Sequence, residues 1–150
     1  MAEEDKLDRV QRLGAYAACV NEDGAILLSR FEAPDLRWGP PGGGVDHGEH
    51  PADGVVREVS EETGYDVRVV RLLGVYSNVW RSPDAEIHAT SLVYEVALVG
   101  GTLRHEIGGS SDQAAWLSLS SVPDLHHTPL LDVTLDLLGR RPPEGRSALG

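Results

Sequence analysis

Residues 43–65 constrain the fold more than any other part of the chain, because a glycine-rich turn leads directly into an acidic helix. Pro51 suits the first position of a helix, and Gly64 suits the position just past its end. This punctuation predicts a helix over about residues 51–63. The turn before it, residues 38–44, carries two prolines and three consecutive glycines, which is typical of backbone that another group approaches closely.

Three glutamates share one face of this predicted helix. Glu58, Glu61 and Glu62 stand at i, i+3 and i+4, which brings their side chains together on the helix surface. Crowded carboxylates repel one another, so the arrangement is favourable only if a hard divalent cation binds their oxygens. A solvated acidic face is the ordinary alternative, but the glycine turn in front of the helix favours a metal site.

The same segment resembles the sequence motif of the Nudix hydrolases. That motif is a glycine, five residues, a glutamate, seven residues, and then Arg-Glu-aliphatic-x-Glu-Glu-x-Gly-aliphatic. The matching residues in this chain are Gly43, Glu49, Arg57, Glu58, Val59, Glu61, Glu62 and Gly64. Tyr65 replaces the final aliphatic residue, which we expect to alter packing more than chemistry. The resemblance implies an α/β fold, the Nudix-type α/β/α sandwich with a mixed sheet, and an enzyme that hydrolyses phosphoanhydride bonds.

The resemblance also implies roles for individual residues. Glu58 and Glu62 are expected to bind Mg²⁺, or Mn²⁺, directly. Glu61 is expected to share in ligation or to bind through water, and the carbonyl of Gly43 to add another oxygen. Arg57, four residues before Glu61, is expected to orient that carboxylate.

Two further residues of the segment have open roles. Glu49 either binds the metal directly or supports a ligand, and the sequence does not separate these alternatives. Gly54 lies inside the predicted helix, where glycine costs about 1 kcal/mol relative to alanine. We expect the fold simply to tolerate Gly54; the alternative is that the missing methyl group gives room to a substrate or a loop.

The group that accepts the proton of the attacking water is less clearly marked. Related proteins often carry glutamates in a Glu-Ser-x-Glu-like stretch ahead of a tryptophan and the last strand. Here residues 110–113 read Ser-Ser-Asp-Gln ahead of Trp116. Asp112 is therefore the predicted base, with Glu106 or a glutamate of the motif as alternatives and Glu86 and Glu95 as further candidates.

Substrate contacts are predicted around the glycine turn. Arg30 and Arg37 flank it and can pair with phosphate, and Trp38 can stack on a base or ribose. Tyr76 and Trp80 offer further flat surfaces. Each of these residues also has an ordinary alternative, as a solvent-exposed arginine or as an aromatic residue of the core.

The expected substrate is a small nucleotide, namely a nucleoside diphosphate linked to another moiety. A nucleotide sugar such as ADP-ribose is favoured, because residues 74–77 followed by Pro83 resemble the stretch after the motif in nucleotide-sugar members. A scarcity of basic residues near the entrance also favours a substrate of lower charge than a triphosphate. A nucleoside triphosphate pyrophosphatase and a non-hydrolytic nucleotide-binding sensor remain alternatives.

Composition narrows the class of protein. With 13 basic against 24 acidic residues, the net charge of −11 argues against a nucleic-acid-binding surface. The single cysteine, Cys19, excludes an internal disulfide. No apolar run approaches the ~20 residues of a membrane span, and the charged first residues do not resemble a secretory signal. We therefore expect a cytoplasmic enzyme without membrane contact, and the oligomeric state, including a homodimer, stays open.

The order of elements fits one domain. Residues 1–141 are the predicted hydrolase domain, and residues 142–150 are expected to be a loose tail with little to bury. Residues 1–12 form a polar lead with a helix as one option, and strands over 14–20 and 25–29 are expected to pair as a hairpin through the turn 21–24. The other predicted elements are strands over 67–79, 87–99 and 114–117 and a helix over about 130–138.

Overall fold

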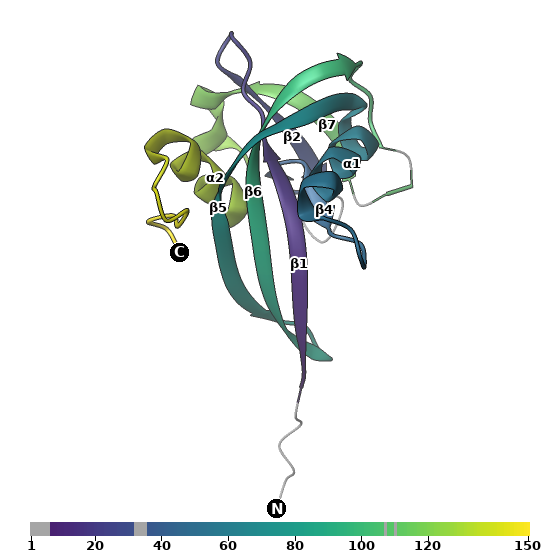
Figure 1. The fold of residues 1–150 in the computed structure, drawn as a ribbon, viewed down its shortest axis with the longest axis vertical. Helices are drawn as coiled ribbons and strands as arrows, with labels where there is room; N and C mark the ends of the chain where they lie inside the picture. The colour runs from purple at the N-terminus through teal and green to yellow at the C-terminus, as the bar shows by residue number, and fades with distance from the viewer. Residues whose placement is uncertain (1–6, 32–35, 107, 110) are drawn as a thin grey trace, which may run out of the picture.

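Two β-sheets lie between two α-helices in this protein (Figure 1). The structure is a computed structural model that describes residues 7–31, 36–106, 108–109 and 111–150. In chain order the elements are β1 (Asp8–Ala18), β2 (Ala25–Phe31), β3 (Trp38–Gly39), β4 (Gly42–Gly44), α1 (Pro51–Thr63), β5 (Tyr65–Arg81), β6 (Ala85–Gly101), β7 (Ser111–Ser118), the 3₁₀-helix η1 (Leu119–Asp124) and α2 (Pro129–Arg140).

The larger sheet is mixed and has the order β4-β1-β6-β5, in which only β1 and β6 run parallel. The smaller sheet is antiparallel and has the order β3-β2-β7. Apolar side chains of α1, including Val55 and Val59, pack with both sheets, while Val133 and Leu137 of α2 pack on the larger sheet. The expected α/β/α arrangement with a mixed sheet is therefore confirmed.

Helix α1 begins and ends where its sequence predicts. His50 is the N-cap and accepts a hydrogen bond from the backbone N–H of Ala52, and Pro51 occupies the first turn. Gly64 closes the helix in the left-handed conformation, at φ 80°. No helix in the described residues is both long enough and apolar enough to cross a membrane.

The N-terminal lead is a strand, so the expectation of a helix there is wrong for the part that is described. Every residue from Asp8 to Ala18 is in register with a residue of β6, beginning with Asp8 opposite Ala85. Pairing along this long ladder outweighs any weak helical preference of the polar residues, because strand formation depends mainly on partners elsewhere in the chain. Residues 1–6 lie outside the described residues.

The predicted hairpin between the first two strands is also wrong. The turn itself forms, since the Asn21 side chain accepts backbone hydrogen bonds from Asp23 and Ala25 and Gly24 has φ 75°. However, β1 and β2 belong to different sheets and meet only through an isolated bridge between Val20 and Ile26. The turn therefore carries the chain from one sheet to the other.

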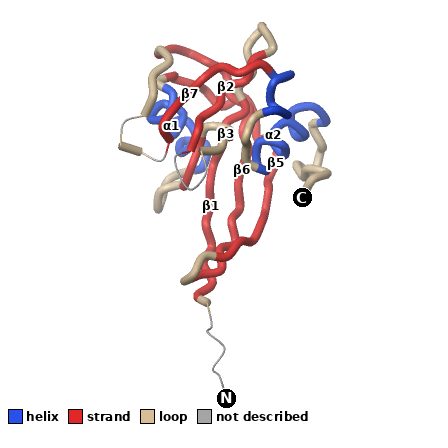
Figure 2. Tube along the Cα trace, turned by 180° about the vertical axis from the view of Figure 1, so that it is seen from behind, coloured by secondary structure: helices blue, strands red, loops and turns tan. Residues whose placement is uncertain are grey.

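The remaining predicted elements are confirmed with longer bounds. The segments 67–79, 87–99 and 114–117 lie within β5, β6 and β7, and the segment 130–138 lies within α2. Strands β1, β5 and β6 extend beyond both helices as a three-stranded ribbon, as the views from both sides show (Figures 1 and 2). This ribbon supplies one wall of the cavity described below.

The C-terminal segment 142–150 makes more contacts with the body than its composition led us to expect. The carbonyl of Gly145 accepts a hydrogen bond of 2.8 Å from the N–H of Val75, at the outer edge of β5. Ser147 is buried, and its hydroxyl donates a hydrogen bond of 2.7 Å to Asp136 of α2. A side chain on Gly74 would lie 2.3 Å from the Gly145 carbonyl oxygen, so the two backbones cross where only glycine fits.

Candidate active site

Arg57 of α1 is the centre of a network of carboxylates. It donates hydrogen bonds to Glu49 at 2.9 and 3.0 Å, to Glu58 at 3.0 Å, to Glu61 at 3.3 Å and to the Gly44 carbonyl at 3.1 Å. The hydrogen bonds from Arg57 lower the pKa of Glu49 to about 2. Arg57 therefore orients three carboxylates, not Glu61 alone. Its hydrogen bonds to Glu49 and Glu58 are shorter than its hydrogen bond to Glu61.

Glu62 is the buried end of the acidic face, with 0% of its surface exposed. One carboxylate oxygen, Oε2, accepts hydrogen bonds from the Gly42 N–H at 2.8 Å and the Ser29 hydroxyl at 3.3 Å. The other oxygen, Oε1, has no hydrogen-bond partner among the described residues. Burial raises the pKa of Glu62 to about 9, and the nearby charge of Glu58 adds to this effect. Glu62 therefore holds a proton at neutral pH unless a cation compensates its charge.

Glu58 lies between the buried and the exposed ends of this face. A Cβ atom on Gly43 would stand 3.0 Å from the carboxyl carbon of Glu58 and 3.1 Å from each of its oxygens, so the glycine lets this carboxylate approach the turn. Burial raises the pKa of Glu58, while the hydrogen bond from Arg57 opposes that rise. The side chain of Glu61 is 52% exposed. The three carboxylates thus run from solvent into the core.

Gly54 makes room for Glu49. A Cβ atom on Gly54 would lie 2.9 Å from Oε1 of Glu49. This contact favours the alternative, that the missing methyl group gives room to the preceding loop, here to its Glu49 side chain. That side chain is the one that Arg57 holds most firmly.

Arg30, Trp38 and Asp112 form a separate cluster that joins β2, β3 and β7. Arg30 donates to both carboxylate oxygens of Asp112, at 3.0 and 2.7 Å, and its guanidinium lies 5.9 Å from the centre of the Trp38 ring. The hydrogen bonds from Arg30 lower the pKa of Asp112. A general base needs a free acceptor oxygen and a pKa near the working pH, and this pairing gives Asp112 neither property.

Glu106 lies in a loop that is fastened close to the acidic face. The backbone N–H of Arg104 donates to the Thr63 carbonyl at 2.8 Å, and the Nδ1 atom of His105 accepts from the Ala114 N–H at 3.1 Å. The charge of Glu106 contributes to the raised pKa values of the two more buried carboxylates of α1. Glu106 is therefore a fifth carboxylate acting on this site, after Glu49, Glu58, Glu61 and Glu62.

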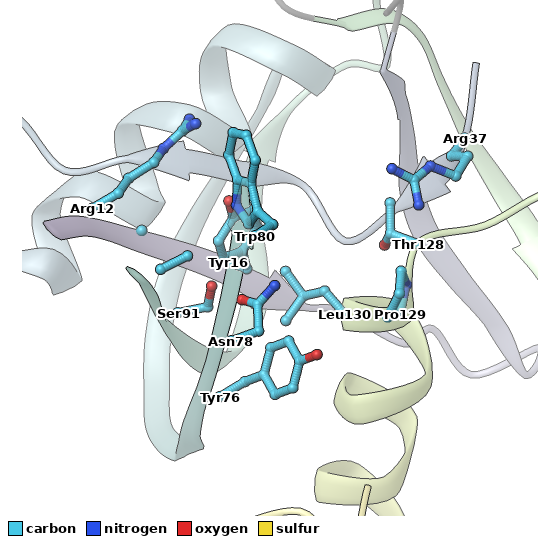
Figure 3. A pocket seen from close by; sticks show the side chains of 12 residues that line it. Arg12, Tyr16, Arg37, Tyr76, Asn78, Trp80, Ser91, Thr128, Pro129 and Leu130 are labelled. Carbon is cyan, nitrogen blue, oxygen red and sulfur yellow. The ribbon is translucent and has the colours of Figure 1, made fainter. Parts of the chain in front are cut away.

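A cavity of about 600 Å³ opens between the β-ribbon and the start of α2 (Figure 3). Its walls combine aromatic rings, two arginines and neutral polar groups. The main lining residues are Arg12, Tyr16, Arg37, Tyr76, Asn78, Trp80, Ser91, Thr128 and Leu130.

Only some of the residues predicted to contact the substrate line this cavity. Arg37, Tyr76 and Trp80 line it, whereas Arg30 and Trp38 are not among its lining residues. Arg12, Tyr16 and Asn78 also line the cavity and were not predicted from the sequence. Residues 12, 14 and 16 alternate along β1 and so share one face, a signal that becomes readable only once the N-terminal lead is recognised as a strand.

Tyr16 marks the boundary between this cavity and the acidic face. It is opposite Gly42 in the β1–β4 pairing, and its neighbour Ala15 is opposite Gly43. Burial raises the pKa of Tyr16, Arg12 lowers it, and the charges of Glu62 and Glu58 raise it. The cavity and the carboxylates are therefore adjacent parts of one site.

The donor set suits a hard divalent metal. Within the described residues, no group of three or more histidine, cysteine, aspartate or glutamate side chains is already arranged to hold a metal ion. However, Glu62 has an unpartnered oxygen, Glu58 lies against the glycine turn, and all of these donors are oxygens. Arg57 bonds only one oxygen of Glu58, Oε1, so Oε2 can bind a metal ion while Arg57 holds the side chain in place.

Comparison with known proteins identifies the family. The NUDIX domain model matches residues 10–137. An ADP-ribose pyrophosphatase of Methanocaldococcus jannaschii is 35% identical over 113 residues, which cover 74% of this chain and 64% of that protein. Among solved structures, the MutT NUDIX hydrolase of Burkholderia pseudomallei has a TM-score of 0.67 at 29% identity, with 85% of this chain and 98% of that chain covered. An ADP-ribose pyrophosphatase of Streptococcus suis has a TM-score of 0.64 at 26% identity, with 90% and 96% covered.

The chain spans less than two thirds of the length of the curated relatives that head this comparison. The matched residues nevertheless include both helices, apart from the last turn of α2, and the whole acidic face. This chain belongs to the NUDIX family.

Proposed function

We propose that this protein is a metal-dependent pyrophosphohydrolase that cleaves a nucleoside diphosphate linked to another moiety. A nucleotide sugar of the ADP-ribose type is the favoured substrate. The observation that carries the proposal is the direct adjacency, at Tyr16, of an acidic face with an unpartnered buried carboxylate oxygen and a 600 Å³ cavity. We expect a diphosphate that lies across Tyr16 to contact both parts.

Glu58, Glu62 and Glu61, with the Gly43 carbonyl, are the groups suited to hold Mg²⁺ or Mn²⁺. A divalent ion bound there supplies Lewis-acid activation of water and neutralises charge on the phosphate oxygens. Arg57 keeps the carboxylates in place through the hydrogen bonds described above. NUDIX hydrolases as a family generally use divalent metal ions, which agrees with this assignment.

The reaction consumes one water. Water adds to one phosphorus of the substrate, the bridging P–O bond breaks, and a nucleoside monophosphate and a phosphorylated second moiety leave. The proton of the water passes to a general base. We assign this role to Glu106 instead of Asp112, because the Asp112 carboxylate is occupied by Arg30 and Glu106 acts electrostatically on the site.

The lining of the cavity supports a substrate with a neutral second moiety. Asn78, Ser91 and Thr128 offer hydrogen bonds that suit sugar hydroxyls or a base edge, and Trp80 offers a flat apolar surface. Arg12 and Arg37 are the two basic residues among those that line the cavity. Two positive charges do not balance the charge of a triphosphate, so the lining suits a substrate of lower charge. A nucleotide sugar uses both kinds of group.

The test is a comparison of kcat/KM for ADP-ribose, GDP-mannose, ATP, dGTP and 8-oxo-dGTP with Mg²⁺ or Mn²⁺, with the products separated by chromatography. We expect ADP-ribose or GDP-mannose to exceed every triphosphate by at least about tenfold, the factor that corresponds to 1.4 kcal/mol. A preference for a triphosphate would refute the substrate class and leave the hydrolase. Binding of these compounds without turnover would instead identify a nucleotide sensor.

A further inference from the structure

We propose that the hydroxyl of Tyr16 donates a hydrogen bond to a phosphate oxygen of the substrate, at the point where the substrate passes from the cavity to the acidic face. This inference rests on the proposed function and adds a substrate-binding residue outside the sequence motif. It follows from the position of the ring, the free hydroxyl and the charges around it.

Two glycines fix the position of the Tyr16 ring. A Cβ atom on Gly14 would lie 2.7 Å from Cε2 of Tyr16 and 3.2 Å from its hydroxyl oxygen. A Cβ atom on Gly42 would lie 2.6 Å from Cδ1 of the same ring. The ring therefore fills the space that two missing side chains leave, and its hydroxyl lies over Gly14, which itself lines the cavity.

The same arrangement ties the ring to the metal-binding turn. Gly42 donates its N–H to Glu62, and Gly43 lies against Glu58. Because Tyr16 is opposite Gly42 in the β-ladder, its side chain projects into the cavity beside the backbone that holds the two more buried carboxylates. Figure 3 shows Tyr16 on the same side of the cavity as Arg12 and Trp80, with Arg37 on the opposite side.

The hydroxyl has no hydrogen bond with another residue in the described part of the chain. It is therefore available to a ligand in the cavity. The charged groups that act on it are Arg12 and the carboxylates of Glu62 and Glu58, and the carboxylates are acceptors only and repel phosphate oxygens. Without a bound metal ion, Glu58 and Glu62 make no favourable contact with a phosphate oxygen. The neutral hydroxyl of Tyr16, between the cavity and the acidic face, can donate one hydrogen bond to it.

The experiment replaces single hydroxyl groups. Tyr16→Phe keeps the ring between the two glycines and removes only the donor. Tyr94→Phe is the matched control, because Tyr94 is buried in the core cluster that contains Val55 and Val59 and is not among the cavity-lining residues. Both variants and the wild type are compared by kcat and KM on the best substrate of the panel above, by Mn²⁺ affinity, and by circular dichroism.

We expect Tyr16→Phe to lower kcat/KM by about 10- to 100-fold, the loss expected for one hydrogen bond to a charged oxygen, with Mn²⁺ affinity unchanged. Tyr94→Phe should change kcat/KM by less than about threefold. A Tyr16→Phe variant that matches the wild type, or equal losses in the two variants, would overturn the inference while the hydrolase function stands. A wild type that turns over no compound would overturn both.

Discussion

Replacing Glu62 with glutamine should stabilise the metal-free protein, and the gain should grow with pH. Glu62 has an ordinary pKa of 4.5 in the unfolded chain and a pKa of about 9 in the folded protein. Between these values the unfolded state has released a proton that the folded state retains, so stability falls by about 1.4 kcal/mol per pH unit. At pH 7 the accumulated cost is about 3 kcal/mol, a large part of the 5–15 kcal/mol that typically separates folded from unfolded states.

Glutamine keeps the shape and the acceptor that Gly42 and Ser29 use, but it does not ionise. Urea denaturation in EDTA at pH 5, 7 and 8.5 measures the difference between Glu62→Gln and the wild type. It should be below about 1 kcal/mol at pH 5 and should reach about 3 kcal/mol at pH 7, since only the wild type titrates. Saturating Mg²⁺ should stabilise the wild type more than the variant. A difference that stays constant with pH would show that Glu62 ionises normally, and the reasoning on its burial would fail.

Three other outcomes follow from the described contacts. Glu62→Gln, and the wild type in excess chelator, should lose nearly all hydrolytic activity in a product-release assay; full turnover in either would contradict the metal site. Glu106→Gln should lower kcat by about 10²–10⁴-fold, and Asp112→Asn by less than about tenfold, so the reverse ranking would return the base to Asp112. Gly74→Ala should cost about 1–3 kcal/mol of unfolding free energy, because its methyl group meets the Gly145 carbonyl and Leu137. The control Gly139→Ala, which meets nothing within 4 Å, should leave stability equal or raise it by up to about 1 kcal/mol, as thermal melts of the two variants can show.

The parts of the fold that the sequence predicts are those that local chemistry decides. Helix α1 has its cap, its proline and its terminal glycine within its own boundaries. Strand β1 has no such local signal, because its partner β6 lies far along the chain and the ladder between them depends on the whole sheet. The contacts of the C-terminal segment with β5 and α2 likewise depend on partners elsewhere in the chain, which its own composition does not indicate.

In the site, too, the part that lies on one helix can be predicted from the sequence, and the part built from several elements cannot. The acidic face follows from the spacing of Glu58, Glu61 and Glu62 on one helix, and the sequence alone is enough to identify it. The cavity is assembled from β1, β5, β6 and α2, so its lining depends on register and strand direction. The pairing of Arg30 with Asp112 joins residues 82 positions apart, and no local pattern predicts that this carboxylate is occupied.

The hydrogen bond between Val75 and Gly145 has a further consequence, for solubility. Strand β5 is the outermost strand of its sheet in the described chain, and an open strand edge is a template on which a second molecule can add a strand. The C-terminal segment occupies this edge at Val75, and the neighbouring residues Leu72 and Val79 are 49% and 59% exposed. If the segment were lifted, the strand edge at Val75 would be uncovered beside these apolar residues. Loss of this contact should therefore favour self-association of the protein through the edge of β5.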